Sequence, residues 1–307
     1  MKKLQKGDTI GILTPASAFN PERLSEAIRN FEQFGLNVKV AANALKHNGF
    51  LAGTDQERLD DLHSLFADPE VKGIFCIRGG YGAARLLPHI DFDLIAKNKK
   101  IFAGYSDITA LLTAFYKKSN LKGFHAPMGL ANFNDFVINS YENTFFGNGH
   151  EVIYADNPEI LSKGKAKGKT KGKAKGELLG GNLAVFVTLL GSEYWVDTKG
   201  KILFFEDIDE EPYRIDRFLT QLRIGGHLQK AAGIVLGQFT DCETRKNPED
   251  SFAVNEVIKE RLQGLNIPII KGFPFGHMDK NMVLPFGGMV EINSSDASMR
   301  FLNSPFE

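Results

Sequence analysis

Ser106 stands where a short apolar run ends and a helical pattern begins, a position from which a serine can act as a nucleophile. Ile101–Gly104 is followed by Tyr-Ser-Asp, and apolar residues then recur at the spacing of one helix face, at Ile108, Leu111, Leu112 and Phe115. A serine on such a tight turn places its hydroxyl at the positive end of the helix, and the N–H of Asp107 is free to meet an oxyanion. The pattern predicts a nucleophile elbow.

A second interpretation of the same residues is a helix cap. Ser-Asp-Ile-Thr is ordinary N-cap chemistry, in which the serine hydroxyl accepts a hydrogen bond from the first turn of the helix. The familiar elbow also carries a second glycine two residues after the serine, whereas this chain has Ile108 there. The segment alone leaves both interpretations open.

A serine nucleophile needs a base and an acid that orients the base. His277 lies in a loop framed by glycine and proline that follows an apolar run, and His125 is a competitor. Glu206 comes directly after the apolar run at 202–205, so it can leave the core and still be held in place. Asp207 and Asp209 are neighbours that could substitute for it.

The segment Arg78–Gly82 follows another apolar run and is rich in glycine. It lacks the third glycine of a dinucleotide fingerprint, so nucleotide binding has little support. The alternative is that Gly79 and Gly80 present main-chain N–H groups to a developing oxyanion. Neither a paired Cys-x-x-Cys nor a His-Glu-x-x-His motif is present, and we expect no metal and no cofactor.

The bulk composition is that of a globular protein rather than a membrane or nucleic-acid-binding protein. The chain has 307 residues, 43% of them hydrophobic and 24% charged, and a formal net charge of +0. Seven lysines alternate with Gly, Ala and Thr between Lys163 and Lys175, and without them the net charge is −7. No signal peptide, membrane span or disulfide framework is indicated, so we expect a cytoplasmic protein.

Strand and helix patterns alternate through the first half of the chain, which is typical of βαβ units and a parallel sheet. Ligands in such sheets sit beyond the carboxyl ends of the strands, where we place the loops 14–17, 78–82 and 104–107. We predict an N-terminal α/β domain over 1–160. A flexible linker over 161–176 joins it to a mixed α/β domain over 177–307.

Five motifs occur in one order along most of the chain. They are Arg78-Gly-Gly-Tyr-Gly82, Gly104-Tyr-Ser106-Asp-Ile-Thr, Gly176-Glu-Leu-Leu-Gly-Gly-Asn-Leu183, Glu206-Asp-Ile with Pro212-Tyr-Arg-Ile-Asp-Arg217, and Gly272-Phe-Pro-Phe-Gly-His277. In this order they resemble the serine L,D-carboxypeptidases, or muramoyl-tetrapeptide carboxypeptidases, whose relatives include microcin C immunity-type peptidases. The resemblance runs from about Gly7 to Pro285.

The resemblance implies a catalytic triad and a reaction. Ser106 would be the nucleophile, His277 the general base and Glu206 the orienting acid. The N–H of Asp107, with one from Gly79 or Gly80, would form the oxyanion hole. The implied reaction is removal of the terminal D-alanine from murein tetrapeptides during cell-wall recycling.

The substrate side of the site is less defined by the sequence. Arg78 is a candidate for binding the free carboxylate of the substrate, and we also assign Tyr81 and Asn182 to substrate binding. We expect a murein peptide as partner, a homodimer, and no nucleic acid or membrane. Two alternatives remain: hydrolysis of a peptidyl-nucleotide of the microcin C type, and non-catalytic binding of a small ligand between two lobes.

Overall fold

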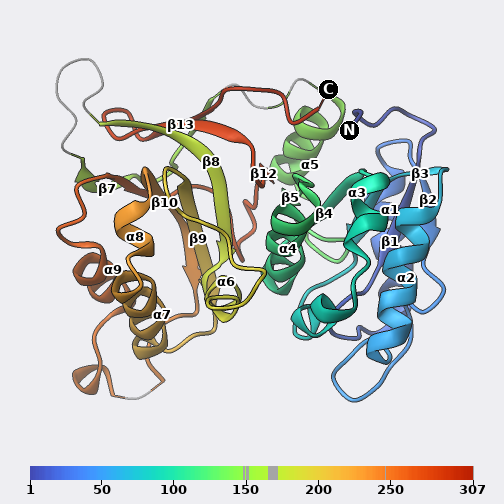
Figure 1. Ribbon diagram of the computed structural model, residues 1–307, viewed down its shortest axis with the longest axis horizontal. Coiled ribbons are helices and arrows are strands. Elements are labelled where there is room, and N and C mark those ends of the chain that lie inside the picture. The colour runs from blue at the N-terminus through green and yellow to red at the C-terminus, as the bar shows by residue number, and fades with distance from the viewer. Residues whose placement is uncertain (148, 150–151, 165–171, 246, 307) are drawn as a thin grey trace. The chain divides into compact units, whose positions relative to one another are not determined.

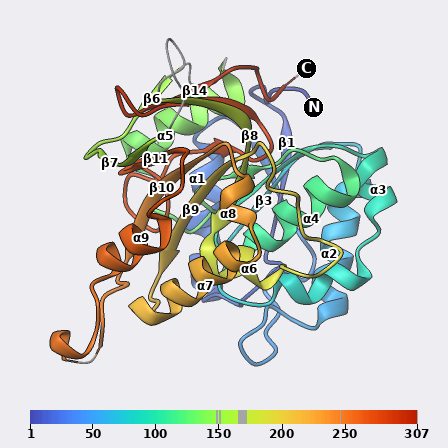
Figure 2. The ribbon, with the colours of Figure 1, turned by 60° about the vertical axis from the view of Figure 1, so that its left-hand side comes forward.

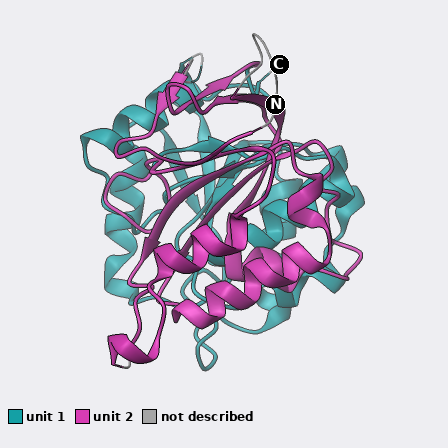
Figure 3. Cartoon of the chain, turned by 90° about the vertical axis from the view of Figure 1, so that its left-hand side faces the viewer, with its two compact units in different colours: residues 1–149, 282–286, 304–307 teal, residues 150–281, 287–303 magenta. Residues whose placement is uncertain are grey.

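The computed structural model describes residues 1–306 apart from 148, 150–151, 165–171 and 246. The chain forms two units, coloured separately in Figure 3. Unit 1 comprises residues 1–149, 282–286 and 304–307, and unit 2 comprises residues 150–281 and 287–303. Both are built on a β-sheet with helices, as the predicted α/β class requires.

Unit 1 has a six-stranded sheet in the order β12-β5-β4-β3-β1-β2. Its strands are β1 Thr9–Leu13, β2 Asn37–Val40, β3 Val71–Cys76, β4 Ile101–Gly104, β5 Phe124–His125 and β12 Leu284–Pro285. Its helices are α1 Leu24–Glu32, α2 Asp55–Ala67, α3 Phe92–Lys97, α4 Thr109–Ser119 and α5 Asp135–Tyr141 (Figure 1). The first five strands are parallel, so the carboxyl ends of β1, β3 and β4 lie side by side.

Local sequence accounts for much of unit 1. Thr54 and Glu57 form a capping box that opens α2. On α1, Ala27 and Phe31 are buried, as the apolar spacing predicts. The strand β3 is almost wholly buried, which is typical of a parallel strand covered on both faces.

Unit 2 has an eight-stranded sheet in the order β6-β14-β13-β8-β9-β10-β11-β7. Its strands are β6 Val152–Tyr154, β7 Glu159–Lys163, β8 Lys173–Asn182, β9 Ile202–Ile208, β10 Gly233–Thr240, β11 Pro268–Lys271, β13 Met289–Asn293 and β14 Ser298–Phe301. Its helices are α6 Leu183–Thr188, α7 Pro212–Ile224, α8 His227–Lys230 and α9 Val254–Leu262. Strands β8 to β11 are parallel, and Figure 2 shows helices α7 and α9 together beside them.

The prediction of a flexible linker over 161–176 is wrong at both ends of that range. Residues 161–163 belong to β7, which pairs with β11, and residues 173–176 belong to β8, which pairs with β13. Lysines on β8 are compatible with a strand because Lys173 and Lys175 form ion pairs with Glu291 on β13. Residues 165–171 of the predicted linker lie outside the described residues.

The predicted C-terminal domain over 177–307 also differs from the structure. Leu284 and Pro285 pair with β5 and so extend the sheet of unit 1, while the strands on either side of them in sequence belong to unit 2. The boundary before unit 2 falls at 149/150 rather than at 160. A strand of two residues is too short to show a periodicity, so the sequence carried no signal that Leu284 and Pro285 join the sheet of unit 1.

Across the described ranges of the chain, no helix is long and apolar enough to span a membrane.

Candidate active site

Ser106 lies on a sharp turn between β4 and α4. Tyr105 is extended, with φ −143°, and Ser106 takes φ +61°, a left-handed conformation that costs a non-glycine residue on the order of 1–3 kcal/mol. A 3-10 turn over Ser106–Ile108 then leads into α4. The residue at the N-cap of that turn is Tyr105, so the structure does not use Ser106 as a helix cap. The half-buried Ser106 has the backbone of a nucleophile elbow.

Gly104 is required by the packing of this turn. A Cβ added to it would lie 2.9 Å from Cγ2 of Ile108, the residue found where the familiar elbow has its second glycine. The turn therefore brings the main chain at Gly104 against a branched side chain. The departure from the familiar pattern at Ile108 is compatible with the elbow because Gly104 leaves room for it.

The three predicted loops meet at the carboxyl ends of β1, β3 and β4. The N–H of Ser17 donates to the carbonyl of Gly79 over 3.2 Å, and the Ser17 hydroxyl accepts from the N–H of Tyr81 over 3.0 Å. A Cβ added to Gly79 would lie 3.2 Å from Cβ of Ser106 and 3.4 Å from the main-chain N of Asp107. Gly79 is thus the glycine whose Cα lies against the Ser106 turn, while Gly80 packs against Ser17.

The two predicted substrate-binding residues of this segment differ in their surroundings. Arg78 donates from Nη1 to the carbonyl of Ala18 over 2.8 Å, so part of its guanidinium is used within unit 1. Tyr81 is 57% exposed, and its ring packs edge-on against the exposed ring of Phe50 at 5.5 Å between centroids. This aromatic pair flanks the loop of Ser17 and leaves Tyr81 accessible to a ligand.

Glu206 and His277 form a close pair in unit 2. Oε2 of Glu206 lies 2.7 Å from Nδ1 of His277, and the side chains are 0% and 15% exposed, respectively. Glu206 lies within β9, which continues to Ile208, and not after the end of the strand as predicted. Oε1 of Glu206 is buried and has no hydrogen-bond partner among the described residues. A buried carboxylate of this kind orients an imidazole and stabilises its protonated form.

The loop after β11 brings His277 to β9 across the end of β10. The N–H of Gln238 donates to the carbonyl of Phe275 over 3.0 Å, and the Thr240 hydroxyl donates to the carbonyl of His277 over 2.6 Å. Asn281 accepts from the N–H of Gly276 over 3.1 Å. These bonds fix the imidazole at the carboxyl ends of parallel strands, where ligands bind in α/β sheets.

Gly276 makes the approach of the Glu206 carboxylate to His277 possible, and this gives a prediction. Its φ is +114°, and an added Cβ would lie 2.9 Å from Cβ of Glu206 and 3.1 Å from Oε2. We expect Gly276→Ala to lower kcat by at least about tenfold, because a misplaced acid no longer orients the base. Gly264→Ala is the matched control. It has φ +79° with nothing within 4 Å, so it should cost only backbone strain, on the order of 1 kcal/mol, and leave kcat unchanged. Equal kcat losses in both variants, measured alongside urea unfolding, would contradict this role for Gly276.

Asn182, also predicted to bind substrate, is held by hydrogen bonds within unit 2. It is buried, its Nδ2 donates to Asp207 over 2.8 Å, and its Oδ1 caps α6 by accepting from the N–H of Val185 over 3.1 Å. Both ends of the amide are therefore engaged inside unit 2. Asn182 therefore holds α6 and Asp207 in place, and its contact with substrate stays a prediction.

The alternative candidates have structural surroundings as well. His125 on β5 is fully buried, and its ring packs against Tyr105 at 5.5 Å between centroids. Asp209 is largely exposed and forms an ion pair with Arg245. Asp207 is buried and accepts hydrogen bonds from the N–H groups of Ala184 and Ile208, each over 2.9 Å.

Burial, and next the charge of Glu206, raise the pKa of Asp207 from 3.8 to about 7, which predicts a pH effect on stability. Between about pH 4 and 7 the folded chain keeps a proton that the unfolded chain has released. The stabilisation is full below about pH 4 and is lost as the pH rises through 7, on the order of 4 kcal/mol in total. We expect Asp207→Asn to flatten the free energy of unfolding in this range, as measured by urea denaturation. A curve of unchanged slope in the variant would show that Asp207 ionises normally.

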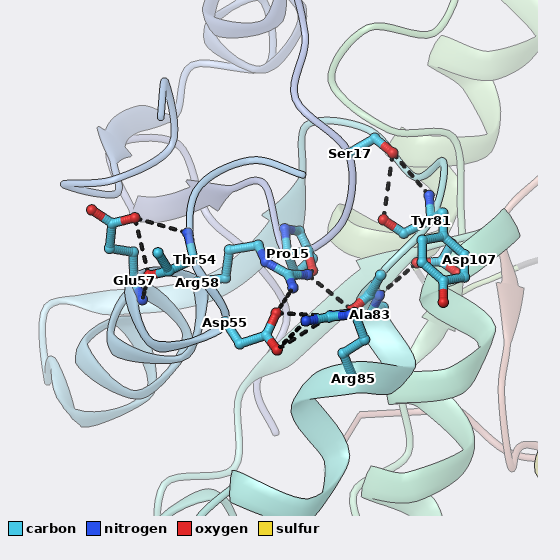
Figure 4. A network of polar contacts seen from close by, with 11 residues as sticks. Pro15, Ser17, Thr54, Asp55, Glu57, Arg58, Tyr81, Ala83, Arg85 and Asp107 are labelled. Atoms are coloured by element: carbon cyan, nitrogen blue, oxygen red, sulfur yellow. Dashed lines mark hydrogen bonds and ion pairs between the residues drawn. The ribbon is translucent and has the colours of Figure 1, made fainter. Parts of the chain in front are cut away.

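Two charged residues near Ser106 were missed by the sequence analysis. The Asp107 side chain accepts from the N–H of Ala83 over 2.7 Å, and burial raises its pKa to about 6. Arg58 on α2 is 1% exposed and donates to the carbonyl of Gly82 over 2.9 Å (Figure 4). The sequence pattern points to the N–H of Asp107 but not to its side chain. Arg58 lies in the charged first turns of a helix, a pattern that normally indicates a solvated face.

Family models match both halves of the chain. Residues 10–126 match the model described as LD-carboxypeptidase N-terminal domain, and residues 175–292 match the model described as LD-carboxypeptidase C-terminal domain. The chain is 41% identical to a Bacillus subtilis protein named probable murein peptide carboxypeptidase, over 96% of this chain and 92% of that protein.

Solved structures share the fold. A muramoyltetrapeptide carboxypeptidase from Oxalobacter formigenes superposes with a TM-score of 0.80 at 28% identity, covering 95% of this chain and 97% of that one. An MccF-like protein from Bacillus anthracis superposes with a TM-score of 0.83 at 27% identity, covering 98% of each chain.

Proposed function

Because the chain belongs to the LD-carboxypeptidase family, we propose that it is a serine peptidase that removes the C-terminal D-alanine from murein tetrapeptides. The observation that carries the serine mechanism is the left-handed backbone of Ser106 at a strand–helix junction, beside Gly79. The substrate class comes from the relatives, whose names refer to murein peptides and to muramoyltetrapeptide.

In the proposed mechanism, Ser106, His277 and Glu206 act as a triad. Oγ of Ser106 attacks the carbonyl carbon of the scissile bond and gives its proton to Nε2 of His277. Glu206, 2.7 Å from Nδ1, holds the imidazole in the tautomer with the proton on Nδ1 and stabilises the imidazolium. A buried acid suits this role because its charge is not screened by water.

The oxyanion of the tetrahedral intermediate would be bound by main-chain N–H groups. We assign the N–H of Asp107 and one from Gly79 or Gly80, and favour the Gly79 side because that residue lies against Ser106. As the intermediate collapses, the C–N bond breaks and His277 gives its proton to the amine of the leaving D-alanine. Water then hydrolyses the acyl-enzyme, with His277 again as the base.

The substrate would be bound by side chains near these loops. We keep Arg78 as the proposed ligand of the substrate carboxylate, and the exposed Tyr81 as a contact for the peptide. We also propose that the protein works in the cytoplasm as a homodimer. Light scattering coupled to size-exclusion chromatography tests the oligomeric state.

The activity is tested with a murein tetrapeptide and with an analogue that ends in L-alanine. We expect alanine to be released from the first substrate only, and mass spectrometry measures this release. Release from both would remove the L,D specificity from the proposal and leave a serine carboxypeptidase. No release from either, by a protein that is folded and binds the peptide, would favour the ligand-binding alternative.

A second candidate is hydrolysis of a peptidyl-nucleotide, favoured by the likeness to the microcin C7 self-immunity protein MccF, which has been solved in complex with aspartyl sulfamoyl adenosine and is 26% identical to this chain. A third arm of the same experiment therefore contains an aminoacyl sulfamoyl nucleoside. A kcat/KM for this compound that exceeds the value for the tetrapeptide would make it the preferred substrate class.

A further inference from the structure

Two charged side chains, Arg58 and Asp107, are buried beneath the glycine-rich segment 79–83. We infer that they are positioning residues, which hold the main chain of this segment in register with the Ser106 turn. The inference rests on the proposed function of that turn, because its purpose would be to keep the oxyanion-binding N–H groups in place. All of the residues involved lie in unit 1.

Asp107 links the Ser106 turn directly to the segment. Its main-chain N lies next to Gly79, and its carboxylate accepts from the N–H of Ala83 over 2.7 Å. Asp107 would supply one oxyanion donor through its main-chain N–H. Through its side chain, Asp107 also anchors the far end of the segment 79–83, which would supply the other donor. The side chain is only 5% exposed, so little water competes for this bond.

Arg58 holds the same segment from the opposite side. Its Nη1 donates to the carbonyl of Gly82 over 2.9 Å and to the carbonyl of Pro15 in the loop after β1 (Figure 4). Nη2 forms an ion pair with Asp55, which Arg85 also contacts over 2.8 Å. A guanidinium can make these bonds at once because its donors are fixed in one plane.

The segment has the shape that these contacts require. Gly82 has φ +121°, and an added Cβ would lie 2.4 Å from Leu51 and 3.1 Å from Nη1 of Arg58. Gly80 has φ +104°, and an added Cβ would lie 2.4 Å from Oγ of Ser17. The glycines therefore allow Arg58 and Ser17 to approach the main chain closely, and the segment is held at Gly79, Tyr81, Gly82 and Ala83 in turn.

A buried arginine is unusual if stability is its only purpose. Arg58 loses its hydration, which lowers its pKa, and its Nε has no partner among the described residues. Hydrophobic residues of the same volume commonly stabilise a fold as well or better. The bonds from Arg58 to two loop carbonyls at the strand ends are instead what a rigid support for an oxyanion site needs.

The test compares Arg58→Lys with Arg223→Lys. A lysine amine retains the charge but cannot reproduce the planar fork, so it cannot hold both loop carbonyls. Arg223 is the matched control because its Nη1 also donates to two main-chain carbonyls, those of Arg261 and Gln263 in unit 2. We expect Arg58→Lys to lower kcat on the tetrapeptide by about 10- to 100-fold with KM within about twofold, and Arg223→Lys to change neither.

Two further readouts separate this inference from the proposed function. A fluorophosphonate labels the enzyme by forming a bond from Ser106 Oγ to phosphorus with loss of fluoride. The rate of this labelling depends on the oxyanion site but not on the contacts that bind the peptide substrate. Hydrogen exchange at Tyr81 and Ala83 reports the position of the segment without any reaction. We expect slower labelling and faster exchange in Arg58→Lys. A wild-type protein that neither cleaves nor labels would overturn the proposed function, while the exchange data would still decide the inference.

Asp107 provides a second pair of variants if Arg58→Lys does not fold. Asp107→Asn keeps an oxygen that can accept from the N–H of Ala83, whereas Asp107→Ala does not. We expect the alanine variant to lower kcat by about 10- to 100-fold, and the asparagine variant to recover at least about threefold of that loss because it restores the bond to Ala83. Wild-type kcat in folded Asp107→Ala or Arg58→Lys, or a loss confined to thermal stability or to KM, would overturn the inference.

Discussion

Replacing Ser106 with alanine is expected to lower kcat on the tetrapeptide by about 10⁴- to 10⁶-fold, the size of effect seen when a triad nucleophile is removed. Without Oγ no acyl-enzyme can form, and what remains is binding and any oxyanion stabilisation. Ser64→Ala on α2 is the control, since that hydroxyl donates to the carbonyl of Asp61 within its own helix over 3.0 Å. If Ser106→Ala retains turnover within about tenfold of wild type, Ser106 is not the nucleophile.

The backbone at Ser106 adds a signature that a simple loss of activity lacks. Its φ of +61° is unfavourable for serine and for alanine, but not for glycine. Ser106→Gly should therefore be as inactive as Ser106→Ala, yet more resistant to urea by up to about 1 kcal/mol. A glycine variant that is less stable than the alanine variant would show that the turn is not strained.

The second large effect is expected from the Glu206–His277 pair. His277→Ala should lower kcat about as much as Ser106→Ala, and the double variant Ser106→Ala/His277→Ala should be no worse than either one, because triad residues act as a unit. Glu206→Gln should cost about 10⁴-fold, because an amide facing Nδ1 favours the wrong tautomer of the imidazole. Steady-state kinetics with purified variants measures each value.

The control for the acid is Asp209→Asn, since Asp209 is largely exposed and tolerates asparagine at its φ of +62°. Its kcat should match wild type. Additive losses in the Ser106/His277 double variant would mean that the two residues serve different steps. A large loss in Asp209→Asn with little change in Glu206→Gln would move the role of the acid to Asp209.

The amino-acid sequence by itself determined the local features of this protein. The alternation of strand and helix, and the position of Ser106 where a strand ends and a helix begins, depend on neighbouring residues, so periodicity was enough to predict them. For Ser106 the local pattern left the elbow and the helix cap both open, and the backbone conformation decided between them. The order of five short motifs also led to the family, which the comparisons confirm. The sequence likewise pointed to Glu206 and His277, but only as residues of suitable type in suitable loops.

Only the tertiary structure decided which of these residues touch. Glu206 and His277 are 71 residues apart, and they meet because a loop after one strand crosses the end of the next. The return of Leu284 and Pro285 to the sheet of unit 1, and the burial of Arg58 under 79–83, had no local signal. Pairing between strands and the burial of a charge are set by partners distant in sequence, and residue spacing along the chain carries no information about those partners.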